Sequence, residues 1–162
     1  MPVTVKHITL WRTEVENKPG VLARTLEALS AAGADLHVVM GYRYPGGGEK
    51  AAIEVYPVAS KKSVAAAQAA RLSASSISTL LVEGDNKPGL AHAVAKALGD
   101  TGINVGFDIA QVVGRRYSAV VGFERQVDAN NAAALIKKAT AARKGETEPA
   151  IRSRVRVSGG EL

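Results

Sequence analysis

A segment of six residues occurs twice in this chain. Glu-Asn-Lys-Pro-Gly-Val at 16–21 recurs as Asp-Asn-Lys-Pro-Gly-Leu at 85–90, an offset of 69 residues between Asn17 and Asn86. The same offset aligns three further pairs: Glu14 with Glu83, Gly33 with Gly102, and Asp35 with Asn104. A repeat that keeps its register over about twenty residues indicates two copies of one structural unit. The 162 residues are therefore expected to form two small modules in tandem.

Each copy begins with an extended segment and continues into a helix. The segments 7–15 and 77–83 are rich in Ile, Leu, Thr and Val, which predicts strands. Proline suits the first helical position and the asparagine before it can cap, so a helix is expected to begin at each Pro-Gly pair. Gly33 and Gly102 are expected to end these helices.

A hairpin and a second helix are predicted to follow in each copy. Period-two segments at 36–42 and 105–109 are followed by glycine-containing turns and return strands at 51–56 and 118–124. Ser60 and Asp128 are expected to cap alanine-rich helices that reach about Leu72 and Arg143. The order predicts an α+β fold of two ferredoxin-like βαββαβ modules, with antiparallel sheets and helices on one face.

The fourth strand of each module is the open point. Alternating Ile or Val and Arg at 151–157 predict a last strand with one exposed face. Only Ser73-Ala74-Ser75-Ser76 lies between the second helix and the next strand, too short for a strand plus a linker. Either the first module ends as βαββα, or the strand 151–157 completes it. The expected modules are residues 1–74 and 75–162.

The amino-acid composition of the chain excludes several classes of function. The chain has no cysteine, which excludes disulfides, thiolate nucleophiles and cysteine-based zinc sites. No stretch approaches about 20 apolar residues and the first residues lack a signal-peptide pattern, so no membrane contact and a cytoplasmic location are expected. A net charge of +6 favours acidic partners, but the basic residues are scattered, which is typical of a solvated surface.

With the Asn-Lys-Pro-Gly loop at a strand-to-helix turn in both copies, the sequence resembles the ACT domain over nearly its whole length. The resemblance implies a non-catalytic regulatory module that binds a small amino acid between paired domains. The implied contacts are the turn before the first helix and the start of the second strand. They correspond to Asn17, Pro19, Gly20, Val21, Leu22 and Asp35 in the first copy, and to Asn86, Pro88, Gly89, Leu90, Ala91 and Asn104 in the second.

The chemistry of these residues agrees with that role. Glycine lets a ligand approach the backbone closely, and free N–H groups at a helix N-terminus attract a carboxylate. An asparagine or aspartate side chain can accept a hydrogen bond from an ammonium group. The alternative is that each Pro-Gly pair only starts a helix and binds no ligand.

Other functions find less support in the sequence. No catalytic triad, carboxylate pair, cofactor fingerprint or histidine metal pattern is present, so neither enzyme activity nor a cofactor or metal is expected. An RNA-binding sheet needs several aromatics on its central strands, and the corresponding segment 114–121 supplies only Tyr117. A protein-interaction module without a small ligand remains as the alternative. Open sheet edges favour a homodimer, and a partner enzyme or regulator would read the ligand state.

Overall fold

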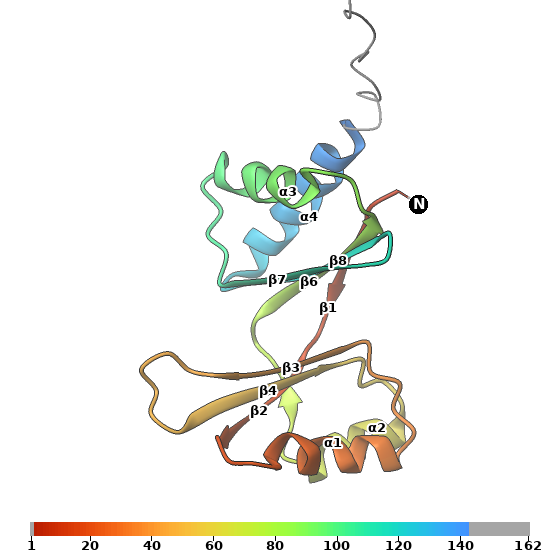
Figure 1. Ribbon diagram of the computed structural model, residues 1–162, viewed down its shortest axis with the longest axis vertical. Coiled ribbons are helices and arrows are strands. Elements are labelled where there is room, and N and C mark those ends of the chain that lie inside the picture. The colour runs from red at the N-terminus through yellow and green to blue at the C-terminus, as the bar shows by residue number, and fades with distance from the viewer. Residues whose placement is uncertain (1, 143–162) are drawn as a thin grey trace, which may run out of the picture.

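The computed structural model describes residues 2–142, which form two four-stranded antiparallel sheets and four helices (Figure 1). The module-one sheet has the order β3 (Val38–Arg43), β4 (Lys50–Tyr56), β2 (Trp11–Glu16), β5 (Ser73–Ala74). The module-two sheet has the order β1 (Thr4–Ile8), β6 (Ser78–Asp85), β8 (Arg116–Phe123), β7 (Phe107–Val113). The helices are α1 (Val21–Ala31), α2 (Lys61–Ala69), α3 (Leu90–Gly99) and α4 (Gln126–Ala142). This confirms the predicted fold class.

The helices cover the outer faces of the two sheets, and the inner faces meet in the middle of the molecule (Figure 1). Leu29 of α1 and Ala67 of α2 pack on Ile53 and Val55 in module one. In module two, α3 and α4 pack on β6 and β8 around the fully buried Phe123. Each sheet thus has its own helix-side core, as period-two strands with one apolar face require.

A third cluster joins the two sheets. Val38 and Met40 of β3 pack with Leu81 of β6 and Val120 of β8, and Ile8 and Leu10 complete the cluster. Leu81 and Val120 alternate along β6 and β8 with side chains of the helix-side core, so both faces of these two strands are apolar. The modules therefore contact each other through the sheet faces that carry no helix.

The N-terminal segment is divided between the sheets. The expected single strand 7–15 is two strands, because β1 pairs with β6 of module two while β2 pairs with β4 of module one. Residues 4–8 thus lie in the sheet of the second module, although the sequence placed them with the first. The alternation of apolar residues does not reveal that the chain passes from one sheet to the other at Thr9 and Leu10.

The fourth strand of module one is β5. It has two residues and pairs with β2 through Trp11–Ala74 and Arg12–Ser73, in the segment that was expected to be too short for a strand plus a linker. The connection continues at once to β6, and the Ser75 N–H donates to the Leu10 carbonyl at 2.8 Å. The two segments that cross between the sheets are therefore joined to each other. The predicted strand 151–157 lies outside the described residues.

Helix starts agree only in part with expectation. Ser60 caps α2, since its side-chain oxygen accepts the Ser63 N–H at 3.0 Å. Asp128 lies inside the first turn of α4, where it binds Arg125. Among the described residues, no helix has the length and apolar character needed to span a membrane.

Candidate functional site

The two Asn-Lys-Pro-Gly loops have the same backbone shape. The Val21 N–H donates to the Lys18 carbonyl at 3.2 Å, and the Leu90 N–H donates to the Lys87 carbonyl at 3.0 Å. Gly20 has φ 81° and ψ −6°, and Gly89 has φ 78° and ψ 8°. Proline followed by a glycine at positive φ defines a type II turn. The repeated Pro-Gly pair therefore encodes a turn that precedes each helix.

This turn changes the expected helix start. The helices begin at Val21 and Leu90, with Gly20 and Gly89 as N-caps, so neither proline occupies the first helical position. Neither helix has a side-chain hydrogen bond at its N-cap, so the asparagines do not cap. The reason is geometric, because the type II turn leaves three residues between each asparagine and the first residue of the helix.

The asparagines instead attach each loop to a hairpin. The Asn17 N–H donates to the Glu49 carbonyl at 2.6 Å, and the Asn86 N–H donates to the Arg115 carbonyl at 2.8 Å. Both asparagine residues are exposed. The loop and the β3–β4 or β7–β8 hairpin of the same module therefore form one surface.

The residues after the two glycines differ between the copies. Leu90 is buried in the module-two core, so its side chain is not available to a ligand. Leu22 is 40% exposed and lies over Gly41 of β3, where an added Cβ would be 3.8 Å from Leu22 Cδ1. Ala91 is the exposed counterpart of Leu22. The surface beside the first loop is therefore the more apolar of the two.

Asp35 and Asn104 do not join the loops of their own modules. They follow α1 and α3, whereas the loops precede these helices, and an 11-residue helix is about 16 Å long. Asp35 is exposed and its carboxylate oxygen lies 3.4 Å from Nε2 of His37. A site that contains both a loop and one of these side chains needs another module.

The two loops also do not face each other. In Figure 1 the turn from β2 into α1 and the turn from β6 into α3 lie at opposite ends of the molecule, on the outer helix layers. A cleft between the modules of one chain therefore does not contain both loops. The cause is the sheet-to-sheet contact, which directs both helix layers outward.

A shallow depression of about 330 Å³ adjoins the first loop. Glu14, Val15, Glu16, Glu49 and Lys50 line it. Lys18 binds Glu16 at 2.9 Å, and this hydrogen bond lowers the pKa of the exposed Glu16 carboxyl. The depression is therefore lined by three carboxylates, Glu14, Glu16 and Glu49, together with Lys50.

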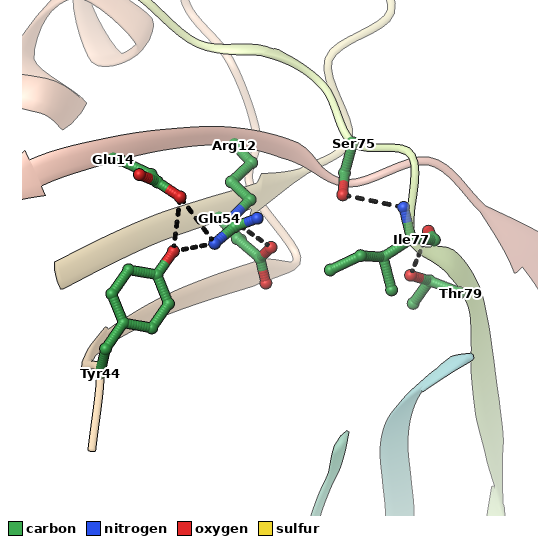
Figure 2. Close-up of polar contacts among 7 residues, drawn as sticks. All are labelled: Arg12, Glu14, Tyr44, Glu54, Ser75, Ile77 and Thr79. Atoms are coloured by element: carbon green, nitrogen blue, oxygen red, sulfur yellow. Dashed lines mark hydrogen bonds and ion pairs between the residues drawn. The ribbon is translucent and has the colours of Figure 1, made fainter. Parts of the chain in front are cut away.

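A polar cluster on the inner face of module one was not predicted from the sequence (Figure 2). Arg12 Nε lies 3.3 Å from a carboxylate oxygen of Glu54, and Nη2 lies 3.4 Å from Glu14. The Tyr44 hydroxyl contacts Arg12 and donates to Glu14 at 3.0 Å. The only signal in the sequence was a charged residue, Glu54, within the otherwise apolar strand 51–56.

Glu54 is the most unusual member of this cluster. Its side chain has no solvent exposure, and among the described residues neither carboxylate oxygen meets a donor with hydrogen-bond geometry. Burial raises the pKa of Glu54, which the Arg12 charge and the Tyr42 hydroxyl offset only in part. Such a buried group needs a physical explanation.

Tyr117, the aromatic residue of the segment compared with RNA-binding strands, is 3% exposed and lies in the module-two core. It is therefore not available for stacking with a base.

Comparisons with known proteins give matches in structure. No protein-family model and no curated protein matches the chain. Protein BT0572 from Bacteroides thetaiotaomicron has a TM-score of 0.64 at 14% identity, with 83% of this chain and 98% of that chain covered. The ligand-free regulatory subunit of aspartate kinase from Thermus thermophilus has a TM-score of 0.57 at 18% identity, with 86% and 97% covered. This chain has the tandem ACT-type fold of the Thermus thermophilus regulatory subunit.

Proposed function

We propose that the protein is a non-catalytic regulator that binds a small amino acid at its Asn-Lys-Pro-Gly loops. The observation that carries the proposal is the recurrence of one type II turn, with a glycine at positive φ, at the start of α1 and α3. The fold shared with regulatory subunits of aspartate kinase supports it.

The turn suits the carboxylate of an amino acid. A helix whose N-cap is glycine has no side-chain oxygen to satisfy the N–H groups of its first turn. Those groups and the helix dipole favour a bound anion. The exposed side chains of Asn17 and Asn86 are suited to accept a hydrogen bond from the ammonium group.

A second copy of the chain would complete the module-two site. Edge strand β7 exposes Ile109, Val112 and Val113, by 47%, 49% and 68%. The loop around Gly89 lies at the end of β7, because Asn86 is bonded to the β7–β8 turn. Antiparallel pairing of two β7 strands would place the start of the partner strand, and with it Asn104 of the second copy, beside this loop.

The same reasoning applies to β3, whose end adjoins the first loop through the Asn17–Glu49 hydrogen bond. An antiparallel partner along β3 would bring its Asp35 to that loop. Ligand binding would then stabilise the paired arrangement, and a partner enzyme or regulator would respond to it. The size of this effect equals the differential affinity of the ligand for the two arrangements.

A thermal-shift screen against the twenty amino acids tests the proposal. Binding to the folded state raises Tm as the concentration passes Kd. We expect a selective rise with one small amino acid, weakened by Gly20→Ala or Gly89→Ala because a Cβ at positive φ distorts the turn. Gly46→Ala is the matched control, since Gly46 also has positive φ (72°) but lies outside both loops. No response to any amino acid, or an equal loss in all three variants, would contradict the proposed site.

A further inference from the structure

A pocket of about 380 Å³ lies where the inner faces of the two sheets diverge. Its walls are mostly apolar and come from both modules. Arg12, Tyr42 and Tyr44 belong to module one, whereas Ile77, Gly106, Phe107, Ile109, Phe123 and Glu124 belong to module two or to the connection that leads into it. The pocket is on the sheet faces opposite the Asn-Lys-Pro-Gly loops, so it is separate from the site proposed above.

The described lining of this pocket carries one cation, Arg12, and one carboxylate, Glu124, and two further carboxylates lie behind Arg12. Arg12 is bound by two carboxylates, Glu54 at 3.3 Å and Glu14 at 3.4 Å, and Glu124 adds a third carboxylate at the rim. Among the described residues that line the pocket, Arg12 is the only cation. Because its guanidinium group is already shared between Glu54, Glu14 and Tyr44, little of its charge remains for an anionic ligand.

Glu54 supplies an independent sign of an incomplete site. It pairs with Arg12 across β2 and β4 and with Met40 across β3 and β4, so its side chain is on the inner face of the sheet. The two side chains that oppose its raised pKa, Arg12 and Tyr42, both line the pocket. Among the described residues its buried oxygens meet no donor at good geometry; Arg12 at 3.3 Å and the Tyr42 hydroxyl offset its burial only in part, so these oxygens can accept further hydrogen bonds.

Aromatic rings provide further attraction for a cation. Tyr42 and Tyr44 meet edge to face, with centroids 6.0 Å apart, and Arg12 already lies 5.6 Å from the Tyr44 centroid. Phe107 of module two also lines the pocket. The negative ring faces favour a positive charge within about 6 Å.

We propose that this inter-sheet pocket binds an apolar amine, whose hydrocarbon body packs against Phe107, Ile109 and Ile77 and whose ammonium group interacts with Tyr42, Glu54 and Glu124. Arg12 moves aside to open the approach to Glu54. Because the walls belong to both modules, a bound amine stabilises one relative arrangement of the two sheets.

Three probes with the same hydrocarbon body test the chemistry: 2-phenylethylamine, 3-phenylpropanoate and L-phenylalanine. Titration calorimetry of the full chain is expected to show the amine binding at least about tenfold more tightly than the other two. Equal or tighter binding of the carboxylate or of the amino acid would overturn the proposal, as would the absence of heat from the amine up to about 10 mM.

Single substitutions test which carboxylates interact with the ammonium group. Glu54→Gln and Glu124→Gln are expected to weaken amine binding by roughly fivefold or more, because each removes one carboxylate. Glu27→Gln on α1 is the matched control, since Glu27 is exposed on the outer helix layer. Far-ultraviolet circular dichroism checks whether Glu54→Gln is folded. Glu124→Gln tests the role of a carboxylate in amine binding at an exposed position, where the substitution does not disturb the core. Unchanged amine affinity in both variants would disprove the assignment. Gly20→Ala changes the loop site and should leave the amine affinity unaffected.

Discussion

The ring of Phe107 lies against the backbone of Gly122, its partner across the β7–β8 ladder, so closely that a Cβ at Gly122 would overlap the ring. Phe107 packs against the cluster that joins the two sheets and also lines the inter-sheet pocket. The glycine therefore allows an aromatic side chain to lie flat between the modules.

Gly122→Ala is expected to destabilise the protein by about 2 kcal/mol, because the methyl group displaces the Phe107 ring from a packed interface. Urea unfolding measures the change. Gly99→Ala is the control, since Gly99 lies in α3 with nothing within 4 Å of an added Cβ. That variant should be neutral or slightly stabilising, and equal destabilisation of both variants would count against the packing argument.

Strand β1 should act as part of module two. Val5 is buried in the module-two core and pairs with Val82, so Val5→Ala is expected to cost about 2 kcal/mol. In the Val5→Ala variant, backbone amide hydrogen exchange should become faster first in β6, while the amides of β4 stay protected. Val39→Ala, at an edge position that is 44% exposed, should change stability by less than about 0.5 kcal/mol. Faster exchange in β4 than in β6 would place β1 with module one.

The buried carboxyl of Glu54 predicts a pH dependence. Its folded-state pKa is raised above 4.5 chiefly by burial, so the folded protein holds this proton more tightly than the unfolded chain. The resulting stabilisation is complete below about pH 4.5 and is lost as pH rises through the raised pKa.

Glu54→Gln removes this titration and keeps the shape. The stability of the variant relative to the native protein should therefore increase as pH rises from about 4.5 toward neutral. Urea unfolding at several pH values measures the difference. Burial also raises the pKa of Asp108, but this residue is present in both proteins, so its contribution cancels in the difference. A difference that is constant or falls with pH would refute the raised pKa.

The proposed dimer predicts that β7 is the pairing edge. Val113→Lys places a charge on that edge and should shift the protein toward monomer in sedimentation at two concentrations. Val127→Lys, at a 52% exposed position on α4 and away from both sheet edges, is the matched control and should leave the assembly unchanged. A native protein that is monomeric at both concentrations, or an equal loss of assembly in Val127→Lys, would contradict pairing along β7.

The local parts of this structure follow from the sequence. The repeat at 16–21 and 85–90 predicted two modules, and its Pro-Gly pairs predicted helix starts close to Val21 and Leu90, although each proline was expected inside the helix and lies in a turn before it. Gly33 and Gly102 predicted where those helices end, since a helix terminates most easily at a residue that tolerates positive φ. Such preferences depend on a few neighbouring residues and are therefore readable in one chain.

Only the tertiary structure decided which strands pair and what covers each face. Nothing within residues 4–16 distinguishes a single strand from two strands in different sheets, because alternation reports a buried face and not the partner that buries it. The burial of Glu54 likewise depends on a second sheet that lies against the inner face of the first. Strand partners and burial arise from contacts between residues far apart in the chain. The sequence by itself therefore determined the modules and their turns, whereas packing determined how the N-terminal segment is divided between the two sheets and where the pocket between them lies.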